Sequence, residues 1–96
     1  MAADFKNLEK TAKALGDVNR LKILALLAQQ GGTGPCSAIQ ECLALAQPSV
    51  SHHLKILTEA GLIKAEKAGR NYTYTLQPTA FELFISGISF NKPVNN

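Results

Sequence analysis

Two clusters of polar and basic side chains in the second half of the chain have the chemistry to bind nucleic acid. The first cluster comprises Gln47, Ser49, Ser51, His52, His53 and Lys55. The second cluster comprises Lys64, Lys67, Arg70, Asn71 and Tyr72. Small polar and basic side chains on a helix can enter the DNA major groove and hydrogen-bond to base edges and phosphates. The two clusters together therefore favour DNA as the ligand.

The first cluster falls on a predicted helix that begins near Gln47. Val50, Leu54 and Leu57 recur at helical spacing and predict the buried face of this helix. The polar residues of the cluster then lie on its exposed face, except that His53 flanks the buried stripe. We expect His52 and its exposed neighbours to face DNA.

The second cluster falls on a predicted β-hairpin. Tyr72, Tyr74 and Leu76 alternate with polar residues, which is the period of a strand, and residues 62–67 are its expected partner. Residues 68–71 are typical of a turn. A basic hairpin that follows a pair of helices is the arrangement of a winged helix-turn-helix, in which the helix reads the groove and the wing contacts phosphates.

Two helices are expected before this unit. Apolar residues at helical spacing predict the first, and Asp17 is suited to cap the second. The expected buried stripe of the second helix consists of Leu21, Leu24, Leu27 and Ala28, widened by Ile23 and Leu26. Residues 31–35 are typical of a loop, and a short third helix follows with Ile39, Leu43 and Cys42 inward.

A final helix is expected after Pro78. Residues 79–82 fit a capping box that opens it, the helix is expected to run to Phe90, and its apolar stripe is Phe81, Phe84, Ile85 and Ile88. The predicted fold is mostly α with a small β-hairpin (α+β), in the order ααααββα. We expect residues 1–90 to form one winged-helix domain and residues 91–96 a frayed tail.

Length and composition exclude several classes of protein. The 96 residues carry a formal net charge of +3, which suggests an anionic partner and no more. The longest apolar run, residues 23–28, is far shorter than the roughly 20 residues of a membrane span. The N-terminal residues do not resemble a signal peptide, so we expect a cytoplasmic protein without membrane association. Catalytic motifs are absent from the sequence, which argues against an enzyme.

Three segments resemble the ArsR/SmtB family of winged-helix repressors. They are ALGDVNRLKIL (residues 14–24), QPSVSHHLKIL running into EAGLI (47–63), and GRNYTYTL (69–76). The resemblance spans about residues 5–90. It implies a homodimeric transcriptional repressor that binds a double-stranded, inverted-repeat operator and releases it when a signal binds. It also implies dimerisation through the first and last helices, whose apolar stripes are Phe5, Leu8, Leu15, Phe81, Phe84, Ile85 and Ile88.

The family's metal ligands are not recognisable here. Its Cys-x-Cys motif falls on Pro35 and Ser37, and the last helix has Glu82 as its only carboxylate and no histidine. We therefore expect no metal and no cofactor, and the sequence does not identify the inducer. Buried, apolar thiols are the simplest interpretation of Cys36 and Cys42. Two alternatives stay open: a winged-helix module that binds a protein partner, and a repressor switched by these two thiols.

Overall fold

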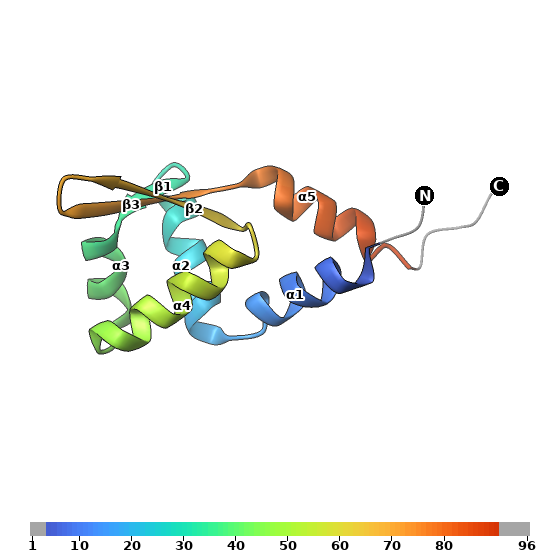
Figure 1. The fold of residues 1–96 in the computed structure, drawn as a ribbon, viewed down its shortest axis with the longest axis horizontal. Helices are drawn as coiled ribbons and strands as arrows, with labels where there is room; N and C mark the ends of the chain where they lie inside the picture. The colour runs from blue at the N-terminus through green and yellow to red at the C-terminus, as the bar shows by residue number, and fades with distance from the viewer. Residues whose placement is uncertain (1–3, 91–96) are drawn as a thin grey trace.

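The predicted winged helix-turn-helix is confirmed by a computed structural model, which describes residues 4–90. In chain order the elements are α1 (Phe5–Leu15), α2 (Val18–Gln29), β1 (Thr33–Pro35), α3 (Cys36–Leu43), α4 (Gln47–Glu59), β2 (Ile63–Ala68), β3 (Asn71–Leu76) and α5 (Pro78–Gly87) (Figure 1). The predicted tail, residues 91–96, lies outside the described residues.

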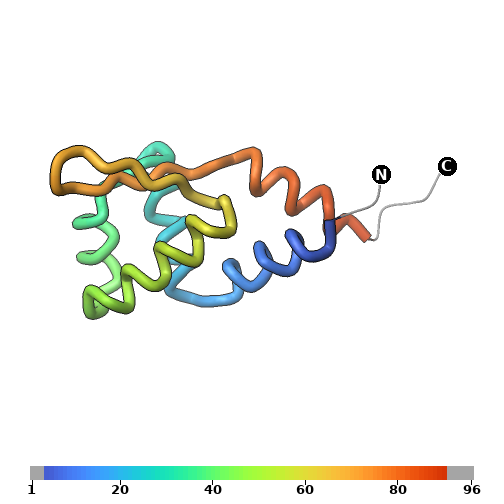
Figure 2. The backbone as a smooth tube through the Cα atoms, in the orientation of Figure 1, coloured from blue at the N-terminus to red at the C-terminus, as the bar shows by residue number. Residues whose placement is uncertain are grey.

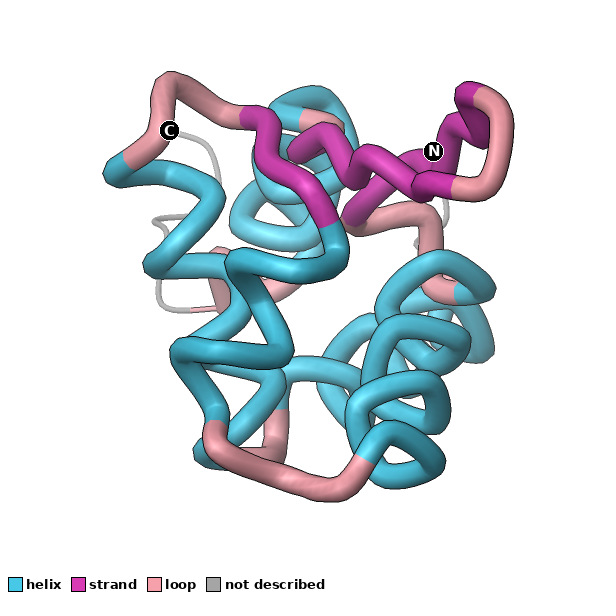
Figure 3. The backbone as a smooth tube through the Cα atoms, turned by 90° about the vertical axis from the view of Figure 1, so that its left-hand side faces the viewer, coloured by secondary structure: helices cyan, strands magenta, loops and turns pink. Residues whose placement is uncertain are grey.

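The strands form an antiparallel sheet in the order β1-β3-β2, with α2, α3 and α4 on one side of it and α5 beyond its end (Figures 1 and 3). β1 corrects our interpretation of residues 31–35 as a loop. Thr33 pairs with Thr75, and their Oγ1 atoms lie 3.0 Å apart. Gly34 is buried, and a β-carbon there would lie 2.5 Å from Gln30 Oε1. The same β-carbon would lie 3.2 Å from Leu27 Cδ2, so this short edge strand packs closely against α2.

The hydrophobic core lies where α2, α3 and α4 meet the sheet. Its apolar residues are Ala14, Ile23, Leu24, Leu27, Ile39, Leu43, Val50, Leu54, Leu57, Leu62 and Ile63. The buried faces predicted for α3 and α4 are confirmed, except that Cys42 is exposed rather than inward. The stripe predicted for α2 is partly wrong, because Leu21 and Ala28 are exposed and Ile23 lies at its centre.

The helix ends show which local signals determined the chain's path. Asp17 caps α2 as predicted, since its carboxylate accepts from the backbone N–H groups of Asn19 and Arg20. Gly61 ends α4 with a φ of +78°, a left-handed conformation in which glycine avoids the strain of a side chain. The capping box predicted at residues 79–82 is wrong, because α5 already begins at Pro78 and ends at Gly87.

The helices α1 and α5 form what we call the arm. They lie side by side and extend away from the sheet and α3 (Figures 1 and 2). The molecule measures 52 × 21 × 21 Å, and its radius of gyration is 14.9 Å. A compact domain of this length has a radius of gyration of about 12.5 Å. The arm therefore has little of its own protomer to pack against. In the part of the chain that is described, no helix is long and apolar enough to cross a membrane.

Candidate nucleic-acid interface

Helix α4 presents a polar face because its opposite face is anchored in the core. Val50, Leu54 and Leu57 are at most 3% exposed. The residues predicted to contact DNA from this helix are exposed, with the exception of His53: they are Gln47, Ser49, Ser51, His52 and Lys55. Ala46 precedes α4 as its N-cap and provides no side-chain hydrogen bond, and Pro48 lies in the first turn of the helix. The exposed face thus combines hydroxyl, imidazole and ammonium groups along one helix.

The hairpin formed by β2 and β3, which we call the wing, projects beyond α4. Its turn is tight, with Gly69 at a φ of +65° and Ala68 paired to Asn71. All five residues predicted to contact DNA from the hairpin are exposed: Lys64, Lys67, Arg70, Asn71 and Tyr72. An exposed basic surface of this kind suits phosphate contacts, which position a protein on DNA without reading its sequence.

The pairing of the strands separates the two wing lysines. Lys67 pairs with Tyr72, and its ammonium lies 6.0 Å from the centre of the Tyr72 ring, within the range of a cation–π contact. Lys64 is three residues before Lys67 on β2 and pairs with Thr75. Because successive side chains of a strand point to opposite faces, Lys64 belongs to the other face of the sheet. The structure brings Lys67 and Tyr72 together and leaves Lys64 apart.

A groove of about 400 Å³ lies between α4 and β3. It is lined by Ser51, Leu54, Lys55, Thr58, Glu59, Tyr72 and Tyr74. The rings of the two tyrosines stack with their centres 6.3 Å apart. Partial burial raises the pKa of the Tyr74 phenol, and the neighbouring Cys36 and Tyr72 groups add to this effect. The phenol therefore keeps its proton at neutral pH and can donate a hydrogen bond.

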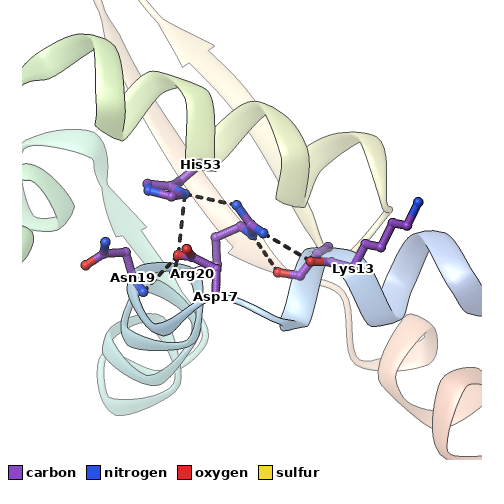
Figure 4. Close-up of polar contacts among 6 residues, drawn as sticks. Lys13, Asp17, Asn19, Arg20 and His53 are labelled. Atoms are coloured by element: carbon purple, nitrogen blue, oxygen red, sulfur yellow. Dashed lines mark hydrogen bonds and ion pairs between the residues drawn. The ribbon is translucent and has the colours of Figure 1, made fainter.

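His53 is placed inward, which departs from its inclusion among the DNA contacts. Its side chain is only 12% exposed, and its Nδ1 lies 3.1 Å from Arg20 Nη1 and 3.7 Å from Asp17 Oδ2 (Figure 4). The hydrogen bond from the backbone N–H of Arg20 lowers the pKa of the Asp17 carboxyl, and the positive charge of Arg20 acts in the same direction. His53 therefore connects α4 to the start of α2.

The contact between Arg20 and His53 was not predicted from the sequence, although a signal for it exists. Arg20 shares a helical face with the buried Ile23 and Leu27. A charged group on a buried face needs polar partners, because an unpaired buried charge is costly. The same reasoning applies to His53, which shares a face with the buried Val50 and Leu57.

The two cysteines lie at opposite ends of α3. Both are free thiols, with Cys36 half-buried at the first residue and Cys42 exposed near the last turn. Six residues of helix rise by about 9 Å, which is more than a disulfide spans. An intramolecular thiol switch would require α3 to unwind. The interpretation of both as buried apolar thiols is also wrong, since neither is buried.

The charged and histidine side chains do not form a metal-binding group in the described part of the chain. No three His, Cys, Asp or Glu residues within 4–90 are arranged to hold a metal ion. Two positions align with the family's Cys-x-Cys motif. They are Pro35, the last residue of β1, and Ser37, in the first turn of α3. Neither side chain is a soft metal ligand.

Comparison with known proteins places this geometry in a family. The model of a family described as a helix-turn-helix domain matches residues 15–66. An uncharacterized HTH-type transcriptional regulator of Methanocaldococcus jannaschii is 46% identical over 83 residues, which cover 82% of this chain and 92% of that protein. The arsenical resistance operon repressor of Bacillus subtilis is 39% identical over 72 residues, covering 75% and 68% of the two chains.

Solved structures of similar proteins superimpose on most of this chain. The crystal structure of an ArsR family transcriptional regulator, RHA00566, superimposes with a TM-score of 0.86 at 25% identity, covering 95% of this chain and 92% of that one. The chain belongs to the ArsR family of helix-turn-helix transcriptional regulators. A homodimeric winged helix-turn-helix DNA-binding domain from Mycobacterium bovis, solved by NMR, matches with a TM-score of 0.73 at 29% identity, covering 85% and 75%.

Membership assigns the roles of the elements in this ArsR-family regulator. It confirms the resemblance drawn from residues 14–24, 47–63 and 69–76, and it makes the protein a regulator rather than an enzyme. In a winged helix-turn-helix, α3 and α4 are the helix pair, α4 is the recognition helix and the β2–β3 hairpin is the wing.

Proposed function

We propose that this regulator is a homodimeric, sequence-specific repressor whose α4 reads the major groove while its wing contacts neighbouring phosphates. The observation that carries the proposal is the exposed polar face of α4 beside the exposed basic hairpin, with Ser51 and Lys55 facing Tyr72 across one groove. In this scheme Ser49, Ser51 and His52 contact base edges. Lys67 and Arg70 bind the backbone from the wing.

The remaining residues of the proposed interface have supporting roles. Gln47, Lys55, Asn71 and Tyr72 lie at its margin, where they contact phosphate or sugar. His53 contacts α2 and supports α4 from behind. Lys64, on the other face of the sheet, adds positive charge near the DNA without facing the groove. Contacts of this kind fix register and add affinity without carrying sequence information.

Self-association through the arm is the second part of the proposal. Phe5 and Ile85 are 65% and 63% exposed, and Ile88 is 41% exposed. Leu8, Leu15, Phe81 and Phe84 are only half-buried. Exposed apolar surface of this extent on a small domain marks an interface, and the related domain from Mycobacterium bovis is homodimeric.

A two-fold dimer predicts the form of the operator. Two symmetry-related recognition helices enter successive major grooves when they lie about 34–36 Å apart. The DNA site is then an inverted repeat whose half-site centres are separated by about 10 base pairs. An inducing signal releases the operator by changing this spacing or the position of the wings.

The test is selection of bound duplexes from random DNA, followed by affinity measurement at about 0.15 M salt. We expect enrichment of an inverted repeat and binding at least about a thousandfold tighter than to a scrambled duplex of equal length. Absence of enrichment would contradict the proposal. It would favour the alternative of a winged-helix module that binds a protein, which predicts only weak, salt-sensitive DNA binding.

A further inference from the structure

Arg20 joins the end of α1 to the start of α2. Its Nε donates a 2.7 Å hydrogen bond to the carbonyl of Ala14, and its Nη2 donates a 3.1 Å bond to the carbonyl of Lys13 (Figure 4). Both carbonyls lie in the last turn of α1, where helical oxygens lack partners within the helix. The Lys13 carbonyl also accepts from the N–H of Gly16 at 3.2 Å, so the guanidinium adds a second donor there and joins the end of α1 to α2.

The same guanidinium reaches the recognition helix. Its Nη1 lies 3.1 Å from Nδ1 of His53, which projects from the middle of α4 (Figure 4). Arginine can only donate hydrogen bonds, so Nδ1 must be the acceptor and the imidazole is neutral, with its proton on Nε2. A planar guanidinium holds three acceptors in a fixed fork, which a lysine ammonium cannot reproduce.

Asp17 holds the backbone of Arg20 in place. Its Oδ2 accepts from the backbone N–H of Arg20 at 3.1 Å and from that of Asn19 at 2.9 Å. The side-chain and backbone groups of one residue thus connect three helices: the last turn of α1, the first turn of α2 and the middle of α4.

We propose that Arg20 is a positioning residue that fixes the orientation of α4 relative to the arm, with His53 as its acceptor on α4. The inference rests on the proposed function, in which α1 belongs to the dimer interface and α4 reads DNA. His53 is adjacent to His52 and two residues from Ser51, so a tilt of α4 at His53 displaces the exposed residues that read bases. Specific recognition depends on this orientation, whereas general attraction to phosphates does not.

The test uses two variants of nearly equal shape. The amide oxygen of His53→Asn occupies the position of Nδ1 and can accept from Arg20, whereas His53→Leu places a methyl group there. Affinities are measured for the selected operator and for a scrambled duplex. We expect His53→Leu to lose about tenfold in operator affinity, and His53→Asn to stay within about threefold of the wild type. Binding to the scrambled duplex should change by less than about twofold.

Thermal unfolding separates positioning from simple stability. Leucine favours a helix more than asparagine does, so stability alone predicts that His53→Leu performs at least as well as His53→Asn. The proposed contact predicts the opposite order for operator affinity. Arg20→Lys should lose at least as much as His53→Leu because it also lacks the bonds to α1, and adding His53→Leu to Arg20→Lys should cause no further loss.

Each outcome either supports or overturns the positioning role proposed for Arg20. If His53→Asn loses as much operator affinity as His53→Leu, or if the Arg20→Lys and His53→Leu losses simply add, the positioning role is overturned while the proposed function stands. A wild-type protein that shows no preference between operator and scrambled DNA overturns the proposed function, and this inference with it. Should His53→Leu fail to fold, Arg20→Lys alone carries the comparison.

Discussion

Leu8 of α1 and Gly87 of α5 are in such close contact that a β-carbon at position 87 would lie 2.5 Å from Leu8 Cδ2. We expect Gly87→Ala to destabilise the protein by about 1 kcal/mol, because the Leu8 side chain must move within a packed contact. This corresponds to a decrease in Tm of roughly 4–8 °C, measured by thermal unfolding at a fixed protein concentration.

The matched control adds Leu8→Val to Gly87→Ala. Valine lacks the δ-carbons that come nearest to the new methyl group. The double variant should therefore be more stable than the sum of the two single changes predicts. Stability of Gly87→Ala equal to or above that of the wild type would show that the helices of the arm are not closely packed at this contact.

A charge on the exposed apolar side of the arm should separate the two subunits. Ile85 is 63% exposed, so Ile85→Glu costs little within one protomer but places a carboxylate in the proposed interface. We expect monomers by analytical ultracentrifugation, folded by circular dichroism, with operator affinity reduced at least about a hundredfold. Ser86→Glu adds the same charge at the next, exposed position and should leave the dimer intact. A dimeric Ile85→Glu protein would rule out this face of α5 as the interface.

Substitutions in the wing and in the recognition helix should affect DNA binding in different ways. Arg70→Ala is expected to weaken binding to every sequence alike and to reduce the slope of log affinity against log salt by about one unit. His52→Ala is expected to leave that slope unchanged and to reduce discrimination at one base pair by about 1–3 kcal/mol. Titrations at several salt concentrations measure both effects. Loss of sequence preference in Arg70→Ala would instead place that residue in a base contact.

The lowered pKa of the Asp17 carboxyl predicts an acid-sensitive helix start. The folded state favours the ionised form, so this stabilisation is complete above the ordinary value of 3.8 and is lost as pH falls through the lower value of the folded protein. Asp17→Asn keeps an oxygen to accept the same backbone hydrogen bonds but cannot ionise. We expect the urea midpoint to fall less between about pH 5 and pH 2.5 in this variant than in the wild type. Parallel curves for the two proteins would assign the acid sensitivity to other carboxylates.

The helices and the hairpin follow from local patterns in the sequence, and β1 does not. Val50, Leu54 and Leu57 alone define the buried face of α4, because helical spacing is a local property. β1 consists of a threonine, a glycine and a proline, which are typical of loops. It becomes a strand only because Thr33 meets Thr75, 42 residues further along the chain. Pairing at that separation leaves no periodic signal in three residues.

The exposed part of the candidate interface was predictable for the same reason, and the inward contacts were not. Ser49, His52 and Lys55 lie on the face opposite a strong apolar stripe, so their exposure follows from that stripe. The partner of His53 depends on how α4 crosses α2, which neither helix encodes alone. Cys42 shows a further limit, because a small apolar residue at the margin of a stripe can lie on either side of it.

The junction between β3 and α5 is very short, and it connects the wing directly to the arm. Gln77 alone separates Leu76, the last residue of β3, from Pro78, the first residue of α5. The N–H groups of Leu76 and Gln77 donate to the carbonyls of Gly32 at 2.7 Å and Leu62 at 3.0 Å. One extended residue spans at most about 3.6 Å, so a larger shift of α5 must pull β3 with it. A displacement of the arm is therefore transmitted to the C-terminal end of β3 and to the hydrogen bonds that hold this end against Gly32 and Leu62.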